Sequence, residues 1–262
     1  MTLVENPRPA PDHAVSRLRT TRLAASSKPY LARGSGLVRC VGCRLLASHC
    51  LCDLRPQVPT QAGMCLLMGD VEALKPTNTG WLVADVVADT WAFGWSRTAV
   101  DPALLALLAD PQWQPYVVFP GEFVAPERVV NALPEPVDAN ASAGARKPLF
   151  VLLDGTWSEA RKMFRKSPYL DAFPVLSLQP EQVASNYRLR RSTHDGHFCT
   201  SEVAALCLAL AGEAHAAQAL AAWLDAFTTH YLSVRRSAPL DQDTPAHHLL
   251  RQLAAARCHP LR

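Results

Sequence analysis

The sequence predicts an α/β protein in which helices cover both faces of a mostly parallel sheet, with a small zinc-binding module near the N-terminus. Short apolar runs alternate with helical patterns along the chain, which is typical of this fold class. The run 149–153 is unbroken, as in a strand that is buried on both faces. Four cysteines within thirteen positions predict the zinc-binding module.

Strands and helices are expected in alternating order. The apolar runs 63–68, 116–119, 149–153 and 174–178 predict strands. The spacing within 81–95 fits a helix or a strand and favours a helix, and a further helical pattern begins directly after Gly155. Ala- and Leu-rich stretches predict helices over 200–232, interrupted near Gly212, and over 245–257.

Length and composition are those of a globular protein: the chain has 262 residues, of which 19% are charged, and a net charge of +3. No apolar run approaches the about 18–20 residues of a membrane span, and the first thirty residues hold no secretory signal. We therefore expect a cytoplasmic protein without membrane contact. Up to Arg55 the chain is basic, with nine Arg or Lys against three acidic residues. We expect a flexible basic extension (1–36), a cysteine module (37–58) and a main domain (59–262).

The cysteine module contains a Cys-x-x-Cys pair and a Cys-x-Cys pair separated by six residues, at Cys40, Cys43, Cys50 and Cys52. Four thiolates satisfy a tetrahedral Zn²⁺ ion and leave no open coordination position, so this zinc would be structural. Disulfides are one alternative, but the cytoplasm would keep these thiols reduced. A redox-active Cys-x-x-Cys pair is the other, but such a pair normally follows a strand, and no strand is predicted before it. Arg39 and Arg44 flank the cysteines and are candidates for contact with a phosphate backbone.

The segment that follows the central apolar run carries the strongest chemical signal. Asp154 ends the predicted strand, where open α/β folds place their ligands. A simpler interpretation is that Asp154 or Thr156 only caps the next helix. The aromatic Trp157 at this turn, followed by the basic residues Arg161, Lys162 and Arg165, favours a functional site.

A second polar group lies at 186–191 and 199–202. Tyr187, Arg188 and Arg190 precede a predicted helix N-terminus, and together they form a candidate anion-binding surface. Thr200, Ser201 and Glu202 begin that helix. The simpler interpretation is that Thr200 or Ser201 caps it and that Glu202, in its first turn, interacts favourably with the helix dipole.

Taken in order, these motifs resemble the DTW-domain family, the tRNA-uridine aminocarboxypropyltransferases. The resemblance covers roughly residues 38–230 and comprises the four cysteines, Asp154-Gly155-Thr156-Trp157 and four further motifs: Asn78-Thr79-Gly80, Phe119-Pro120-Gly121-Glu122, Tyr187-Arg188-Leu189-Arg190 and Cys199-Thr200-Ser201-Glu202. The family usually has a His-Pro pair and charged residues before the Asn-Thr-Gly motif. This chain has Gly69-Asp70-Val71 there instead, which puts the detail of that loop in question.

The resemblance implies a fold related to the SPOUT methyltransferases, with a C-terminal knot that holds the cofactor. It also implies transfer of the 3-amino-3-carboxypropyl group of S-adenosylmethionine to N3 of a tRNA uridine, with release of methylthioadenosine. The residues 59–262 would then be the catalytic domain. A SPOUT-like RNA methyltransferase and a non-catalytic, zinc-containing RNA-binding protein remain as alternatives. The modified uridine and the oligomeric state stay open.

Roles for single residues follow from this reaction. The catalytic candidates are Asp154, Thr156 and Trp157. Asp154 would take the imide proton, and Trp157 would stack on a base or on adenine, unless it is part of the core. The candidates for S-adenosylmethionine binding are Phe119, Pro120, Gly121, Glu122, Tyr187, Arg190, Thr200, Ser201 and Glu202. The candidates for tRNA binding are Arg39, Arg44, Arg161, Lys162, Arg165 and Arg188.

Overall fold

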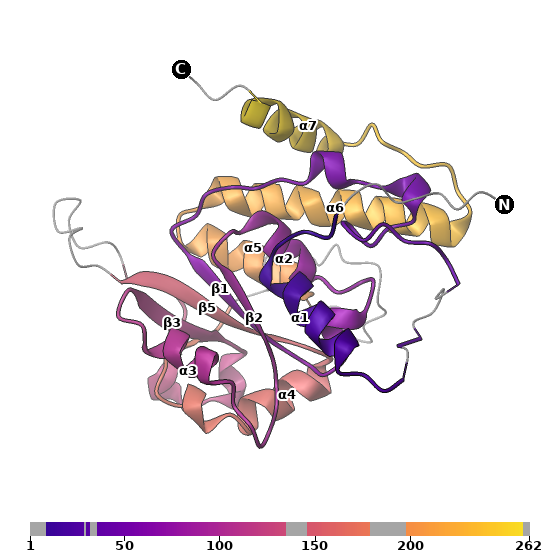
Figure 1. Cartoon of the computed structure of the whole chain (residues 1–262). Coiled ribbons are helices and arrows are strands. Elements are labelled where there is room, and N and C mark those ends of the chain that lie inside the picture. The colour runs from indigo at the N-terminus through magenta and orange to yellow at the C-terminus, as the bar shows by residue number, and fades with distance from the viewer. Residues whose placement is uncertain (1–8, 29, 32–35, 135–145, 179–197, 259–262) are drawn as a thin grey trace.

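A computed structural model describes the chain except for residues 1–8, 29, 32–35, 135–145, 179–197 and 259–262 (Figure 1). Its centre is a sheet with the strand order β2-β1-β5-β3-β6-β4, in which every paired strand is parallel. The strands are β1 (Gly63–Met68), β2 (Thr90–Gly94), β3 (Trp113–Val118), β4 (Val129–Val130), β5 (Lys147–Asp154) and β6 (Val175–Leu176). The predicted parallel sheet is thus confirmed, and the predicted central run lies in β5.

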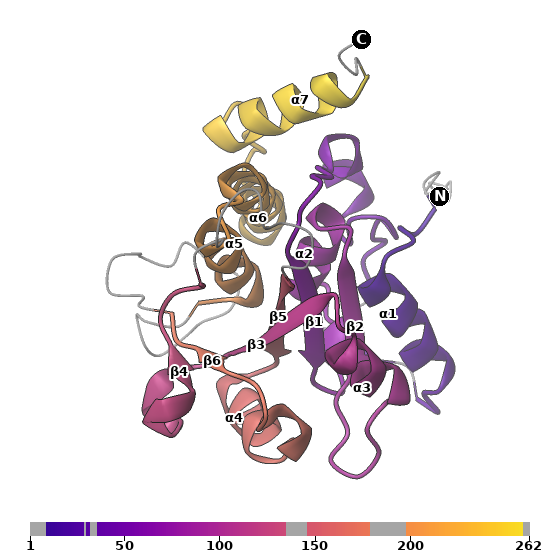
Figure 2. The ribbon, with the colours of Figure 1, turned by 90° about the vertical axis from the view of Figure 1, so that its left-hand side faces the viewer.

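Helices pack on both faces of this sheet, as predicted (Figure 2). Because side chains alternate along a strand, Leu66 and Leu152 belong to one core cluster, whereas Leu67 and Val151 belong to the other. The helices α2 (Gly80–Val86), α5 (Thr200–Leu210) and α6 (Ala214–Arg236) cover the first face. The helices α3 (Pro102–Ala109) and α4 (Trp157–Arg165) cover the second.

The N-terminal extension is partly helical, which corrects the expectation that all of residues 1–36 are flexible. Helix α1 (Ala14–Ala24) has His13 as its N-cap residue, whose Nδ1 accepts a hydrogen bond from the amide of Ser16 at 3.1 Å. Val15 is fully buried, and Arg19 donates to the carbonyls of residues 73 and 74. The sequence pattern does not predict this helix, because its buried residues are confined to the first turn and form no apolar stripe.

The remaining predicted elements are present with one change, and the structure adds α3 and β4, which the sequence analysis did not predict. The stretch 81–95 divides into α2 and β2, so the expected helix is correct for its first half only. As predicted, the helical stretch is interrupted at Gly212, where φ is +78°, and this divides it into α5 and α6. The last helix, α7 (Pro245–Cys258), packs on α6. Short 3₁₀ helices complete the described chain: η1 (Ala47–His49), η2 (Cys52–Leu54), η3 (Glu72–Leu74), η4 (Gly121–Phe123), η5 (Pro126–Arg128) and η6 (Pro168–Leu170).

The cysteine module shares the main core. Cys40, Cys43, Leu45 and Leu51 are buried in the same cluster as α2 and α6. Residues 179–197, between β6 and α5, lie outside the described residues, and the C-terminal knot stays a prediction. Among the described helices, none combines the length and the apolar character needed to cross a bilayer.

Candidate active site

Asp154 is the point at which three distant segments meet. It is the last residue of β5, in the interior of the sheet, and only 3% of its surface is exposed. Its Oδ2 accepts a hydrogen bond from Asn78 Nδ2 at 2.7 Å, and its Oδ1 accepts one from Thr200 Oγ1 at 2.6 Å. The predicted strand-end carboxylate is therefore held from both sides by hydroxyl and amide donors.

The segment before α2 is shaped to receive this carboxylate. The side-chain oxygen of Asn78 accepts a hydrogen bond from the amide of Trp81 at 2.9 Å and so caps the helix. A Cβ atom at Gly80 would lie 2.6 Å from Asp154 Oδ2, closer than any side chain can approach. The motif Asn78-Thr79-Gly80 thus supplies one donor to Asp154 and the space that its carboxylate occupies.

Thr156 caps α4. Its Oγ1 accepts from the amide of Glu159 at 3.3 Å, and the Glu159 carboxylate accepts from the amide of Thr156 at 2.8 Å, which forms a capping box. The simpler interpretation from the sequence is therefore confirmed for Thr156. Asp154 is directed elsewhere, toward α2 and α5.

The start of α5 combines capping with a contact to Asp154. Cys199 occupies the N-cap position, where Thr200 or Ser201 was expected, and Glu202 in the first turn accepts a hydrogen bond from the amide of Cys199 at 2.8 Å. The Thr200 hydroxyl donates to Asp154, and Ser201 is buried. The backbone N–H groups at this helix N-terminus favour a negatively charged ligand group.

Trp157 belongs to an aromatic cluster on the α4 face. Its ring stacks on Phe119 with the centroids 5.5 Å apart, and Phe119 stacks in turn on Phe164 at 4.4 Å. Phe123 lies 5.8 Å from Trp157. Phe119 is buried, whereas Trp157 and Phe123 are 38% and 41% exposed. Trp157 is therefore both a packing residue and an accessible aromatic surface.

The loop after β3 contains four further residues predicted to bind S-adenosylmethionine, Phe119 to Glu122. The amide of Gly121 donates to Ser177 Oγ at 3.0 Å, which ties this loop to the chain that leaves β6. A Cβ atom at Gly121 would lie 3.1 Å from Ser177 Oγ and from Val129, so glycine permits this close approach. Pro120 is half-buried and Glu122 is exposed. Tyr187, Arg188 and Arg190 lie outside the described residues.

The basic candidates divide into two groups. Arg161, Lys162 and Arg165 are exposed on α4, and the Arg161 guanidinium lies 5.0 Å above the Phe123 ring. Arg44 is 4% exposed and donates to two backbone carbonyls, which excludes the expected contact with a phosphate in this conformation. Arg39 is half-buried and lies over a tyrosine ring of α6.

The four cysteines of the module fit a metal ion. All four sulfurs lie within 4.8 Å of one another, and three of the separations are 3.5, 3.6 and 3.8 Å. Tetrahedral zinc with Zn–S bonds of about 2.3 Å would hold its sulfurs about 3.8 Å apart. A hydrogen bond from Cys52 lowers the pKa of Cys43 to about 5, and the same contact raises the pKa of Cys52. This geometry is compatible with structural zinc.

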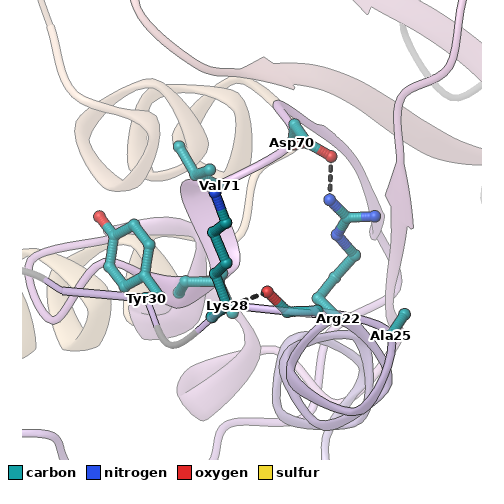
Figure 3. A pocket seen from close by; sticks show the side chains of 8 residues that line it. Arg22, Ala25, Lys28, Tyr30, Asp70 and Val71 are labelled. Carbon is teal, nitrogen blue, oxygen red and sulfur yellow. Dashed lines mark hydrogen bonds and ion pairs between the residues drawn. The ribbon is translucent and has the colours of Figure 1, made fainter.

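A pocket of about 210 Å³ opens beside α1 (Figure 3). Arg22 of α1 and Asp70, which follows β1, form an ion pair at its wall, and Lys28 and Tyr30 also line it. None of the predicted site residues that the structure describes lines this pocket. It is also smaller than the roughly 300–1,000 Å³ typical of sites for drug-sized ligands. We therefore place the candidate active site at Asp154 and not in this pocket.

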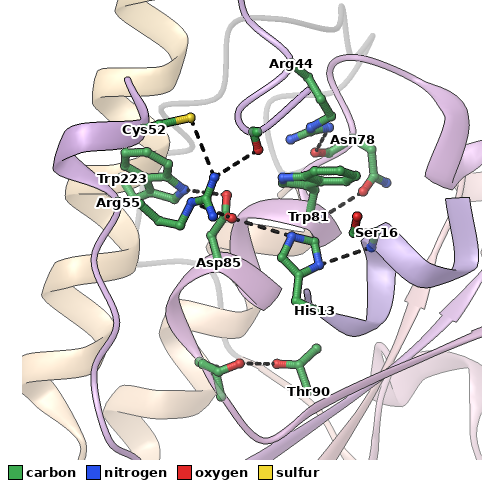
Figure 4. Close-up of polar contacts among 12 residues, drawn as sticks. His13, Ser16, Arg44, Cys52, Arg55, Asn78, Trp81, Asp85, Thr90 and Trp223 are labelled. Carbon is green, nitrogen blue, oxygen red and sulfur yellow. Dashed lines mark hydrogen bonds and ion pairs between the residues drawn. The ribbon is translucent and has the colours of Figure 1, made fainter. Parts of the chain in front are cut away.

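The structure adds residues that the sequence analysis did not assign to a site. Asn78 is the most direct of them, and its place in the Asn-Thr-Gly motif was the available signal. A buried polar network also surrounds α2, where Asp85 accepts from Trp223 Nε1 at 3.1 Å and pairs with Arg55 at 3.1 Å (Figure 4). No local pattern in the sequence predicts these long-range contacts.

Comparison with known proteins agrees with the motifs. No solved structure matches the chain. The family model described as the DTW domain matches residues 37–232, which include the four cysteines, Asp154 and both residues that bond to its carboxylate. Because this match covers more than half of the sequence, the chain belongs to the DTW-domain family, which is consistent with a role in tRNA modification.

Proposed function

We propose that the protein transfers the 3-amino-3-carboxypropyl group of S-adenosylmethionine to N3 of a tRNA uridine. Asp154 takes the proton from N3, and the freed electron pair forms a bond to the methylene carbon next to the sulfonium. The bond between that carbon and sulfur breaks, and its electrons stay on sulfur. Methylthioadenosine then leaves as a neutral thioether.

The position of Asp154 is the observation that carries this proposal. Its carboxylate lies at the carboxyl end of an interior strand, where ligands of open α/β sheets bind. Asn78 and Thr200 fix both of its oxygens, so the base is oriented before the substrate arrives. Because Asp154 is buried and Thr200 is half-buried, we expect the proton to reach the carboxylate through the Thr200 hydroxyl or a bound water.

Two backbone elements are suited to S-adenosylmethionine. The N-terminus of α5 would hold the carboxylate of its amino-acid part, and the loop 119–122 would approach the adenosine at Gly121. Tyr187 and Arg190 are proposed for the same ligand from the resemblance alone. Choice of the methylene carbon over the methyl group then depends on which carbon is held in line with N3.

The outer surface of α4 is suited to the tRNA. Arg161, Lys162 and Arg165 provide cations for phosphates, and the exposed rings of Trp157 and Phe123 provide a surface on which a base can stack. Zinc in the cysteine module would hold the chain without entering the reaction, since four thiolates leave it no free position. A tRNA substrate and reduced thiols both favour the cytoplasm.

The purified protein, S-adenosylmethionine and unmodified tRNA are sufficient for the test. We expect aminocarboxypropyl-uridine in the digested tRNA and methylthioadenosine as the by-product, both identified by mass. Adenosylhomocysteine together with a methylated nucleoside would instead establish the methyltransferase alternative. Salt-sensitive tRNA binding without any new nucleoside would support the non-catalytic alternative.

A further inference from the structure

The cysteine module contacts α2 through two arginines that lie beside its cysteines. Arg44 directly follows Cys43, and Arg55 comes three residues after Cys52. Neither residue faces solvent freely, because Arg44 is buried and Arg55 is half-buried. Both guanidinium groups contact α2 or the segment that enters it, and that of Arg55 also contacts the module itself (Figure 4).

Arg44 holds the segment that enters α2. Its Nη1 donates to the carbonyl of Asn78 at 3.0 Å and to that of Lys75 at 3.3 Å. The guanidinium also lies over the rings of Trp81, at 4.4 Å, and Phe227, at 5.4 Å. Arg44 has a φ of +65°, a left-handed backbone conformation that residues other than glycine seldom adopt. The surrounding cysteine loop holds the backbone of Arg44 in this conformation.

Asn78 passes this constraint to the reacting edge. Its backbone carbonyl is held by Arg44, its side-chain oxygen caps α2 at Trp81, and its side-chain nitrogen donates to Asp154. A continuous series of bonds therefore runs from Cys43 through Arg44 and Asn78 to Asp154. A shift of the cysteine loop would move the donor that orients the carboxylate.

Arg55 fixes α2 at its other end. Its Nη2 donates to the Gly42 carbonyl at 3.1 Å and contacts Cys52 Sγ at 3.6 Å. Its Nε lies 3.1 Å from Asp85, a residue of α2 that is 2% exposed. The same guanidinium thus joins both parts of the cysteine cluster to the helix, and the helix cannot rotate without breaking these contacts.

We infer that the cysteine module, when it holds its metal ion, positions Asn78 through Arg44 and thereby orients Asp154. Arg44 is then a positioning residue for the reaction, and metal occupancy of the module and the geometry of the active site depend on each other. This inference rests on the proposed function for its catalytic part, whereas the coupling between the metal site and α2 is independent of the reaction.

Arg44→Lys tests the inference in the full-length protein. Lysine keeps the charge but lacks the planar group that donates to two carbonyls and stacks on Trp81. We expect kcat to fall about tenfold or more, since small displacements of a reacting group are costly. The KM for S-adenosylmethionine should change less. Amides of 75–86 should exchange hydrogen faster, while those of β5 stay protected.

Arg128→Lys is a matched control on the other face of the sheet. Arg128 also donates to two carbonyls, those of Leu170 at 2.9 Å and Phe173 at 3.0 Å, and it also lies over an aromatic ring. Its replacement should leave kcat and the exchange of 75–86 unchanged. If the Arg44→Lys variant also leaves both kcat and the hydrogen exchange of 75–86 unchanged, the inference is overturned.

Removal of the metal from the wild-type protein gives a second test that needs neither a variant nor activity. A strong chelator should accelerate exchange over 75–86, including the Trp81 amide, before the sheet loses protection. This arm decides the matter if Arg44→Lys does not fold. Unchanged protection of α2 after the metal has left, or full protection in protein that never held zinc, contradicts the inference. If the wild-type makes no modified uridine, the exchange results still test the coupling separately from the proposed function.

Discussion

The two faces of the sheet are built from different chemistry. On the face covered by α2, α5 and α6, polar and charged groups are buried, among them Asp154, Asp85 and Arg44. On the face covered by α3 and α4, aromatic and aliphatic side chains make the core, and the cations of α4 remain outside. For the proposed reaction, the comparison indicates a division of work: the first face would fix the geometry of the Asp154 carboxylate, and the second would present a surface to the substrate.

This difference has an energetic basis. A buried polar group must keep its hydrogen-bond partners, so a change on the first face disturbs both stability and geometry. Exposed cations and aromatic rings contribute little to the stability of the folded protein, so their removal should affect tRNA binding more than stability. The following predictions test this division, beginning with the largest expected effect.

Asp154→Ala should lower the rate of aminocarboxypropyl transfer at least about 100-fold, because a general base contributes roughly 10²–10⁴-fold. The tRNA affinity should change little. The loss of an acceptor for Asn78 and Thr200 should also lower the melting temperature. The rate is measured from the modified nucleoside, and binding is measured separately.

Glu213→Ala is the matched control for this prediction. The Glu213 carboxylate also accepts two hydrogen bonds, from the amides of Gln61 at 2.8 Å and Ala62 at 2.6 Å, but it lies at the amino end of β1. It should retain the wild-type rate. Full activity in Asp154→Ala would remove the carboxylate from the mechanism.

Gly80→Ala should give the next largest effect. Its methyl group would lie 2.6 Å from Asp154 Oδ2, so either α2 or the carboxylate has to move. Overpacking of this kind costs about 1–3 kcal/mol of stability, and we expect at least about a tenfold loss of rate. Gly36→Ala should be silent in both measurements, because no atom of the described residues, apart from Gly36 and its chain neighbours, lies within 4 Å of the new Cβ. A Gly80→Ala enzyme with the wild-type rate would show that the carboxylate tolerates displacement.

The sequence predicted the fold better than the contacts within the site. Apolar runs of β1, β3 and β5 are local patterns, so the strands could be recognised in the chain itself. Helix α1 has no apolar stripe beyond its first turn, and its stability comes from packing on β2 and η3. Local patterns contain no information on such packing.

The same limit applies to the candidate site. Thr156 makes its capping contact three residues along the chain, and the sequence predicted this cap correctly. For α5 the sequence predicted Thr200 or Ser201 as the cap, whereas Cys199 occupies that position. The two donors to Asp154 come from positions 76 and 46 residues away, and only the folded sheet brings them together. From its place beside the cysteines, Arg44 was expected to be a surface cation, yet tertiary packing buries its guanidinium against the rings of Trp81 and Phe227.

Replacement of Arg161 and Lys162 by alanine should weaken tRNA binding moderately and leave the melting temperature nearly unchanged. Each phosphate that the variant no longer neutralises should reduce the slope of log K against log salt by about 0.7–0.9. Titration of tRNA at several salt concentrations measures this slope. Alanine at Arg235 and Arg236, at the end of α6, removes the same charge and should not alter it. Equal effects of the two double variants would contradict a specific role for α4.

The smallest predicted effect concerns the buried pair His230 and His247, which joins α6 to α7. Their Nε2 atoms lie 2.9 Å apart, and His230 Nδ1 lies 2.9 Å from the carbonyl of His49. A carbonyl only accepts, so His230 Nδ1 carries a proton, and in the neutral pair its Nε2 accepts from His247. A second positive charge on the pair would leave two donors facing each other.

Burial lowers the pKa of both His230 and His247 below the ordinary value of 6.5. The unfolded chain therefore binds these protons more readily, so the stabilisation is complete above about pH 6.5 and is lost as the pH falls. Neighbouring charges also act on His247, from Arg251, Asp241, Asp225 and His248, but desolvation is the largest cause.

We therefore expect the melting temperature to fall between about pH 7 and pH 5.5, and His247→Gln to flatten that dependence, because glutamine does not titrate. His215→Gln, an exposed position on the same helix as His230, should keep the wild-type dependence. If His247→Gln leaves the pH profile unaltered, the acid sensitivity arises elsewhere than in this histidine pair. The buried polar groups of the first face would then not include a pair that makes stability depend on pH. A flattened profile would extend the contrast between the two faces of the sheet to the outermost helix, where one shared proton stabilises the packing of α7 on α6.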